Sequence, residues 1–274
     1  MQQVSNMLHR NGKTIGFAPT MGYLHQGHIS LISLSKKNSD RTIVSVFVNP
    51  TQFAPNEDFK KYPRNLQRDK NLLEELNVDY LFIPSANEIY PDDFHTYVNM
   101  DQVTQILEGK FRPTHFRGVT TIVTILFNII NPDYAFFGQK DAQQVFIIKK
   151  MAEDLKFRTK IVVSPIVREK DGLALSSRNV FLSEKERNDA FMLYHSLTHA
   201  RKLISNNKTK TAEIVSGMKR IINRIQSSNL DYISFVDASS FSPVKELIKG
   251  KKYFVLLACS IGKTRLIDNI LVKA

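Results

Sequence analysis

The sequence predicts an α/β protein: a doubly wound parallel sheet followed by a smaller C-terminal α+β domain. Two observations lead to this prediction. Up to about residue 163, short apolar runs alternate with segments whose apolar residues recur at helical spacing, which is typical of parallel strands joined by crossover helices. Beyond residue 171, two helical segments are followed by three strand-like runs. We therefore expect domains at 1–171 and 172–274.

The strands of the first domain are predicted from short apolar runs, of which the continuous run at 42–48 suits a strand that is buried on both faces. These runs cover 14–18, 42–48, 78–83, 133–137 and 160–163. Apolar residues recur at helical spacing in a segment that begins at residue 29 and in the segments 64–77, 116–130 and 143–155. In such a Rossmann-like sheet, ligands bind beyond the carboxyl ends of the strands. We therefore expect the loops at 19–21 and 49–52 to lie at the binding edge.

The second domain begins with a helix signal. Ser183 and Glu186 form a capping-box pattern, which predicts a helix that runs past Leu203. Asn206 and Asn207 end it, and a second helix is expected over about 211–226. Strand-like runs follow at 231–236, 253–261 and 265–272. Since the sequence has no low-complexity linker, we expect a short hinge between the domains.

The composition is that of a globular chain. It has 274 residues, of which 42% are hydrophobic, and no apolar run approaches the roughly 18 residues that a bilayer span requires. The N-terminus lacks the pattern of a signal peptide. The single cysteine, Cys259, excludes an intrachain disulfide and lies in an apolar run. We expect a buried thiol and a reducing, cytoplasmic setting.

The formal net charge of +12 raises nucleic-acid binding as one alternative function. However, the Lys and Arg residues are scattered, and no arginine-rich arm, zinc-ligand spacing or aromatic RNA-binding motif accompanies them. We therefore expect small anionic substrates, and neither a nucleic acid nor a membrane as a partner.

The most informative segment is the stretch PTMGYLHQGH at 19–28, between a predicted strand and a predicted helix. Gly22 and Gly27 let backbone amides approach a ligand closely. His25 and His28 are three residues apart and should project from one side of the first helical turn. A helix N-terminus favours bound phosphate, so this stretch predicts chemistry on a nucleoside triphosphate. The alternative is that these histidines only cap the helix or fill the core.

Four further stretches accompany this motif: VNPTQF at 48–53, EGKFRP at 108–113, FGQKDAQQ at 137–144 and LALSSRN at 173–179. With these motifs in this order, nearly the whole chain resembles the pantoate–β-alanine ligase family, the pantothenate synthetases. Through His-x-Gly-His that family is related to nucleotidylyltransferases and class I aminoacyl-tRNA synthetases.

The resemblance implies a two-step reaction. The pantoate carboxylate attacks the α-phosphorus of ATP to give pantoyl adenylate and pyrophosphate, and the amine of β-alanine then gives pantothenate and AMP. It also implies Mg²⁺ bound through the ATP phosphates and a homodimer formed by the larger domain, with the smaller domain acting as a lid. The alternative enzyme class is a nucleotidyltransferase that adenylates a phosphate ester and stops there.

The resemblance also assigns roles to individual residues, with His28 as the proton donor. The catalytic set is His25, His28, Lys140, Ser176, Ser177 and Arg178. The ATP-binding set adds Met21, Gly22, Tyr23, Leu24, Gln26, Gly27, Gly138, Gln139, Asp141, Val167 and Leu175. The pantoate and β-alanine set is Pro19, Met21, Asn49, Gln52, Phe53 and Gln144, with Tyr62 and Arg112 at further family-like positions.

Three of these assignments keep a structural alternative. Asp141 and Gln144 have the spacing of a capping box, and a capping Gln144 could not fully bind a ligand. Lys140 could be an ordinary surface lysine, and the stretch 176–178 could be a polar hinge. No protein ligand for the metal is predicted, and contact of Asp141 with the metal or the nucleotide stays open.

Overall fold

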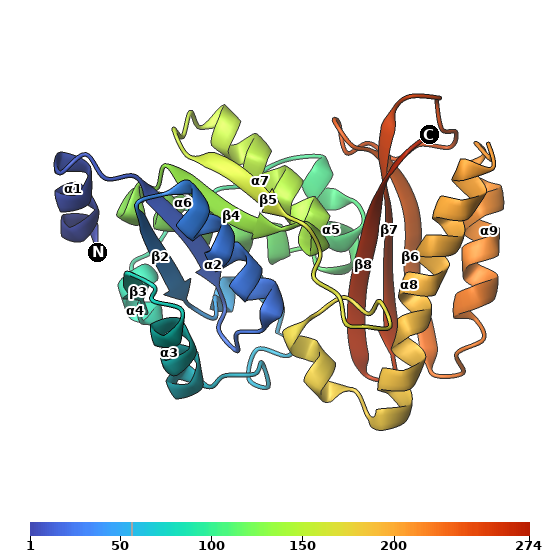
Figure 1. Cartoon of the computed structure of the whole chain (residues 1–274), viewed down its shortest axis with the longest axis horizontal. Coiled ribbons are helices and arrows are strands. Elements are labelled where there is room, and N and C mark those ends of the chain that lie inside the picture. Colours follow the sequence, from blue (N-terminus) through green and yellow to red (C-terminus); the bar gives the residue numbers. More distant parts are fainter. Residues whose placement is uncertain (56) are drawn as a thin grey trace. The chain divides into compact units, whose positions relative to one another are not determined.

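The computed structural model describes residues 1–55 and 57–274, which form two compact units (Figure 1). Unit 1 comprises residues 1–139 and 143–165, and unit 2 comprises 140–142 and 166–274. The change in sequence pattern at 171–172 falls within unit 2, six residues after the chain leaves unit 1. The segment 140–142 is notable because its contacts assign it to unit 2, although its neighbours in sequence belong to unit 1.

Unit 1 contains a five-stranded sheet in the order β3-β2-β1-β4-β5, with every pairing parallel. Its strands are β1 (Ile15–Thr20), β2 (Arg41–Val46), β3 (Tyr80–Phe82), β4 (Tyr134–Gly138) and β5 (Lys160–Ser164). Its helices are α1 (Gln2–Arg10), α2 (Gln26–Asn38), α3 (Leu66–Glu75), α4 (Ala86–Ile89), α5 (Glu108–Phe111), α6 (His115–Ile130) and α7 (Ala142–Asp154). Short 3-10 turns are η1 (Pro50–Gln52), η2 (Val103–Gln105) and η3 (Gln139–Asp141).

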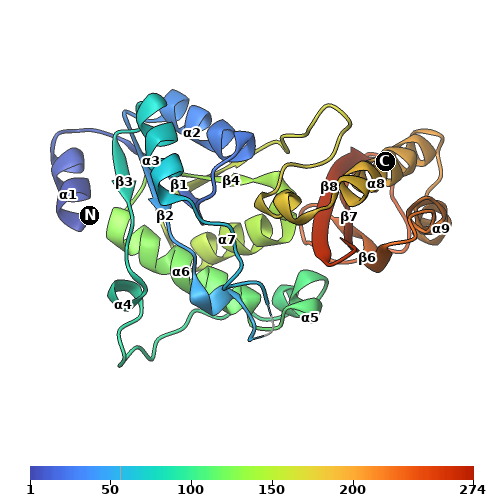
Figure 2. The same cartoon turned by 90° about the horizontal axis from the view of Figure 1, so that it is seen from below.

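Helices cover both faces of this sheet (Figure 2). Successive strand residues point to opposite faces, so Phe17 packs with α1, α6 and α7, whereas Ala18 packs with α2 and α3. Phe136 and Phe137 of β4 divide in the same way. The strands β1, β2 and β4 are largely buried, as the continuous apolar run at 42–48 predicted for β2, whereas the edge strands β3 and β5 are only partly buried. The prediction of a doubly wound parallel sheet is confirmed.

The strand order reverses between β1 and β4, which are neighbours in the sheet, so the topological switch point lies between these two strands. The segments that leave the carboxyl ends of these strands begin at Met21 and Gln139. The segment after β2, which contains η1, begins on the other side of β1. In parallel α/β sheets this edge is where ligands bind.

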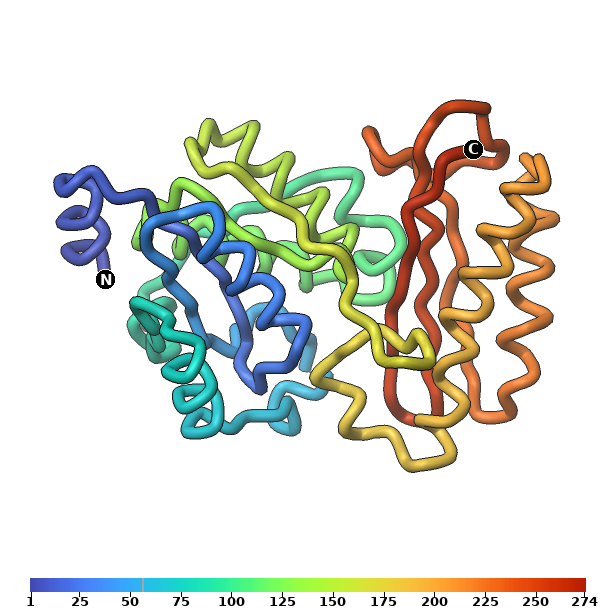
Figure 3. The backbone as a smooth tube through the Cα atoms, in the orientation of Figure 1, coloured from blue at the N-terminus to red at the C-terminus, as the bar shows by residue number. Residues whose placement is uncertain are grey.

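Unit 2 contains an antiparallel sheet in the order β6-β7-β8, made of β6 (Ser228–Asp237), β7 (Lys252–Ile261) and β8 (Thr264–Lys273). Helices α8 (Glu184–Ser205) and α9 (Thr211–Ile222) run alongside the sheet and share its core, and η4 (Ser177–Phe181) precedes them (Figure 3). The predicted α+β domain is confirmed, and the capping box between Ser183 and Glu186 is present.

The second helix of this unit ends earlier than the sequence predicts. Helix α9 stops at Ile222, whereas helical spacing suggested about residue 226. The reason is a side-chain contact: the Ser228 hydroxyl donates to the carbonyls of Ile222 and Ile225, at 3.2 and 2.8 Å, and turns the chain into β6. Among the residues that the structure describes, no helix is long and apolar enough to cross a membrane.

Candidate active site

The turn after β1 is held by a residue that sequence reasoning missed. Gly22 and Tyr23 both have left-handed backbones, with φ of 80° and 50°. The buried Asp69 carboxylate, on α3, accepts the backbone N–H groups of Tyr23 and Leu24 at 2.7 and 2.8 Å. Arg68 donates to the Leu24 carbonyl at 3.0 Å. An acidic residue near a helix start is common, so nothing in the sequence marked Asp69.

The two histidines form a reciprocal cap at the start of α2. Nδ1 of His25 accepts the N–H of Gly27 at 3.1 Å, and Nδ1 of His28 accepts the N–H of His25 at 3.2 Å. The ring centroids are 4.1 Å apart. A Cβ at Gly27 would lie 2.8 Å from the His25 ring, so this position needs glycine. The Nδ1 atoms of both rings therefore act as helix caps.

This cap also fixes where each imidazole carries its proton. A ring nitrogen that accepts a backbone N–H bears no hydrogen, so in the neutral rings of His25 and His28 the proton is on Nε2. Each ring is therefore an N–H donor through Nε2, next to the positive end of the α2 dipole. This arrangement suits an anionic oxygen.

The turn after β2 is built around Asn49, whose side chain is almost completely buried at 1% exposed. Its Oδ1 accepts the hydroxyls of Thr51 and Tyr90 at 3.0 and 2.9 Å. Its Nδ2 donates to the Gly118 carbonyl at 3.1 Å. Burial raises the pKa of Tyr90, which keeps its hydroxyl a donor. In this structure Asn49 supports the shape of η1.

Gln52, at the end of η1, is fixed through its backbone. Its carbonyl accepts Nη2 of Arg112 at 3.2 Å and Nδ1 of His115 at 3.1 Å. Arg112 also forms a two-pronged ion pair with Glu57, at 2.8 and 2.6 Å. The guanidinium is therefore committed to holding this loop, which fits a supporting role for the family-like position 112.

The apolar members of the predicted substrate set lie around these turns. Pro19 is in β1, opposite Ser45. The Phe53 ring meets the edge of the Tyr62 ring at 5.7 Å between centroids. Met21 is partly exposed, whereas Leu24 is fully buried in the core under α2. The Leu24 side chain is therefore part of the core, and its backbone groups are bonded to Asp69 and Arg68.

The segment after β4 begins with open space at Gly138. A Cβ at this glycine would meet no atom within 4 Å, so a ligand could approach the backbone there. Gln144 lies in the first turn of α7. Its neighbour Gln143 is buried and donates to the carbonyls of Val103 and Ile106 at 2.7 and 2.9 Å. Sequence reasoning missed Gln143, because its role depends on a loop 35–40 residues earlier.

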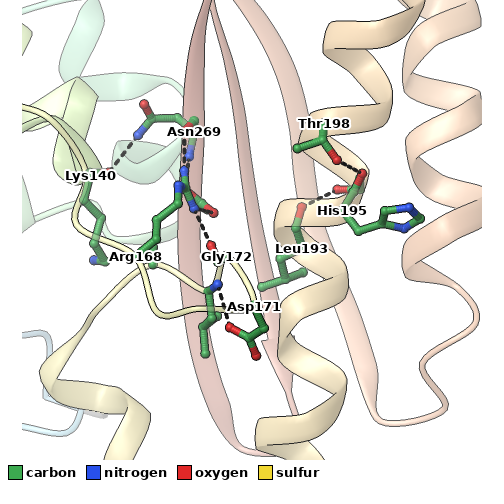
Figure 4. Close-up of polar contacts among 12 residues, drawn as sticks. Lys140, Arg168, Asp171, Gly172, Leu193, His195, Thr198 and Asn269 are labelled. Atoms are coloured by element: carbon green, nitrogen blue, oxygen red, sulfur yellow. Dashed lines mark hydrogen bonds and ion pairs between the residues drawn. The ribbon is translucent and has the colours of Figure 1, made fainter.

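The remaining predicted residues belong to unit 2. Nζ of Lys140 lies 3.8 Å from Asp141 Oδ1, and the Lys140 carbonyl accepts Nδ2 of Asn269 at 2.9 Å (Figure 4). Val167 and Leu175 face each other in a hairpin, with a 3.0 Å bond from the Leu175 N–H to the Val167 carbonyl.

The stretch Ser176–Arg178 starts a 3-10 helix. Ser176 is the N-cap of η4, and its Oγ accepts the Arg178 N–H at 3.3 Å. Ser177 is buried. Unit 1 thus brings the predicted residues of 19–28, 49–53, 138–139 and 144 to its strand ends, and unit 2 holds those of 140–141, 167 and 175–178.

Comparison with known proteins decides the family. The sequence model described as pantoate-beta-alanine ligase matches residues 1–271. The chain belongs to the pantoate–β-alanine ligase family. A pantothenate synthetase of Acetivibrio thermocellus is 54% identical over 265 residues, covering 96% of this chain and 92% of the relative. One of Caldicellulosiruptor bescii is 51% identical over 274 residues, covering 100% and 96%. The family prediction is confirmed.

Solved structures of the ligase family agree. The crystal structure of pantothenate synthetase from Thermus thermophilus has a TM-score of 0.89 and 41% identity, covering 94% of this chain and 92% of that one. The pantoate-beta-alanine ligase from Francisella tularensis, described as complexed with beta-gamma ATP and beta-alanine, has a TM-score of 0.80 and 38% identity, covering 98% and 94%. The protein described here is an enzyme with pantoate–β-alanine ligase activity.

Proposed function

We propose that this ligase works in two steps through a pantoyl adenylate, and releases pyrophosphate and then AMP. The observation that carries the proposal is the reciprocal cap of His25 and His28 at the N-terminus of α2. Because both Nδ1 atoms accept backbone N–H groups, both neutral rings donate through Nε2. The Francisella tularensis relative, described with beta-gamma ATP and beta-alanine, supports ATP and β-alanine as substrates here.

In the first step the pantoate carboxylate is itself the nucleophile, so no serine or cysteine has to be activated. The protein needs to position ATP and stabilise the charge that moves onto pyrophosphate. We assign the Nε2 donors of His25 and His28 to phosphate oxygens, with His28 as the proton donor. The Lys140 ammonium follows the charge toward the leaving group. His25 and His28 follow β1 in sequence, and Lys140 follows β4, the neighbour of β1 in the sheet.

Pantoate is assigned to neutral and apolar side chains. The amides of Gln52 and Gln144 can bond its hydroxyl groups and carboxylate without adding charge. Pro19, Met21 and Phe53 offer apolar surface for its dimethyl carbon. Asn49 contributes by holding η1, which carries Gln52.

A second group of nucleotide contacts is assigned to unit 2. The hydroxyls of Ser176 and Ser177 and the Arg178 guanidinium suit phosphate oxygens, and the backbones of Val167 and Leu175 suit the adenosine. We propose that unit 2 serves as a lid domain, because an acyl adenylate reacts with water and has to be protected until the amine arrives.

Magnesium is proposed to arrive as part of the ATP substrate. Among the groups assigned to the phosphates, the cations Lys140 and Arg178 and the N–H donors of His25 and His28 do not ligate Mg²⁺. Asp141, 3.8 Å from the Lys140 ammonium, is the nearest candidate for a carboxylate contact with the metal or nucleotide. The homodimer is carried over from the family resemblance, and the cytoplasmic location is proposed from the single cysteine. Analytical ultracentrifugation would test the homodimer.

The adenylate is tested with pantoate that carries ¹⁸O in both carboxylate oxygens. Attack on the α-phosphorus transfers one labelled oxygen to AMP when β-alanine is added, and mass spectrometry of the AMP detects it. Without β-alanine, we expect one pyrophosphate per active site, and without pantoate none. Formation of ADP and labelled phosphate would contradict the proposal, because it would indicate an acyl phosphate.

A further inference from the structure

A single side chain far along the chain holds the backbone of Lys140. Nδ2 of Asn269, in β8, donates to the Lys140 carbonyl at 2.9 Å across 129 positions of sequence (Figure 4). Asn269 is 1% exposed. The segment 140–142 belongs by its contacts to the same unit as β8, and not to the unit of its sequence neighbours. The position of Lys140 is therefore linked to β8.

A buried asparagine in the middle of a strand needs a reason. Since successive strand residues point to opposite faces, Ile270 enters the apolar core of unit 2, whereas Asn269 lies on the other face of the sheet, opposite the buried Leu256 of β7. An amide removed from water is costly unless it is hydrogen-bonded, and a buried apolar residue such as Leu256 avoids this cost on the same face. This amide donates to the Lys140 carbonyl, so the asparagine serves that segment.

The backbone of Asn269 is fixed on both sides by a buried ion pair. Arg168 binds Asp268 through two bonds of 2.7 and 2.8 Å, and also donates to the Asn269 carbonyl at 3.1 Å. Asp268 in turn accepts the Asn269 N–H at 2.7 Å. The Arg168 guanidinium also packs over the Tyr194 ring, 4.1 Å from its centroid. These contacts fix the backbone of Asn269, from which its side chain binds the Lys140 carbonyl.

From these contacts we propose that Asn269 is a positioning residue for Lys140, an inference that rests on the proposed role of Lys140 on the ATP phosphates. Asn269 does not touch the reacting atoms. It fixes the main chain from which the flexible lysine stem extends, and so limits the positions that the ammonium can take. The expected effect is on the rate of adenylate formation and not on pantoate affinity.

A double-mutant cycle tests this proposal. We expect Asn269→Ala to lower the kcat of pantoate-dependent pyrophosphate release about tenfold, with the KM for pantoate changed less than about twofold. In the Lys140→Ala background the same change should cost nothing further, because the group that it positions is gone. An equal loss in both backgrounds would overturn the proposal, since it would indicate a general structural role.

Two more variants protect the test. Asn269→Asp keeps the shape but sets an oxygen against the Lys140 carbonyl, so it should lose at least as much rate as Asn269→Ala. Thr211→Val is the matched control, because it removes side-chain bonds to the carbonyls of Val244 and Lys245 in the same unit and should leave kcat unchanged. Thermal melting followed by circular dichroism shows which variants are folded. Full activity of Lys140→Ala would instead refute the proposed role of Lys140.

Discussion

Two of the groups assigned to the phosphates, the histidine pair and Lys140, are held in opposite ways. Both bonds of the cap of His25 and His28 close within three residues of sequence. The backbone of Lys140 depends on Asn269, 129 positions later. The histidine motif is therefore held in part by its own residues, whereas the backbone of Lys140 is held only once β8 has folded against it. The difference indicates which substitutions should act locally and which should act at a distance.

The histidine turn is still not self-sufficient. The left-handed backbone of Tyr23 costs on the order of 1 kcal/mol, because the residue has a Cβ. The two bonds from the backbone to Asp69 offset this cost. Local capping therefore orients the rings, and a distant carboxylate holds the turn that precedes them.

The largest effect is expected at Lys140. Replacement by alanine should lower the kcat of pantoate-dependent pyrophosphate release about 10²- to 10³-fold, since the proposed mechanism relies on this ammonium to follow the charge to the leaving pyrophosphate. Single-turnover measurement with ATP and pantoate would check it. Lys149→Ala, an exposed lysine of α7, is the control and should remain as active as the unchanged enzyme. Near-normal activity of Lys140→Ala would remove it from the proposed mechanism.

The two roles of His25 can be separated by choosing the replacement. Asparagine is a favoured N-cap, so His25→Asn should keep the melting temperature but lose about 10²-fold in kcat, because it has no donor at the position of Nε2. His25→Ala should lose that activity and also about 1 kcal/mol of stability. Urea unfolding and steady-state kinetics of both variants provide the measurement. An active His25→Asn enzyme would mean that His25 serves only as a cap.

The distant support of the same turn is tested at Asp69. The N–H groups of Tyr23 and Leu24 bind different oxygens of Asp69, so in Asp69→Asn one of them would face an NH₂ group that cannot accept it. We expect the KM for ATP to rise about tenfold and the stability to fall by about 1–3 kcal/mol. Asn65→Ala, which removes the N-cap of the same helix, should cost about 1 kcal/mol with the KM for ATP unchanged. If the two variants behave alike in KM, Asp69 does not position the nucleotide turn.

The smallest effect concerns the hairpin of unit 2. The hydrogen bond from Arg187 to Asp171, at 2.7 Å, holds the pKa of that carboxyl below its usual 3.8. Because the folded pKa is the lower one, these contacts stabilise the fold above about pH 4, and the stabilisation is lost as the pH falls through the folded pKa. Asp171→Asn should cost about 0.5 kcal/mol at neutral pH, since the pair is partly exposed. Urea unfolding should show this difference shrinking as the pH falls below the usual pKa of 3.8, and a constant difference would contradict the linkage.

Much of the fold followed from local patterns. Apolar runs predicted each of the strands β1–β5, and the capping-box pattern of Ser183 and Glu186 predicted the start of α8. The motif at 19–28 identified the N-terminus of α2, and the family prediction agrees with the relatives. These features depend on residues within a few positions of each other, so a linear sequence can display them.

The sequence by itself determined the fold class, the positions of most elements and the stretches that carry the chemistry. Only the tertiary structure decided the strand order, the support of the β1 turn by Asp69 and the assignment of Lys140 to unit 2. Gln143, which the sequence did not single out, holds the preceding loop. The physical reason is that periodicity and capping act over one or two turns of chain, whereas these contacts join residues 35 to 129 positions apart, and their pairing exists only after the chain has folded.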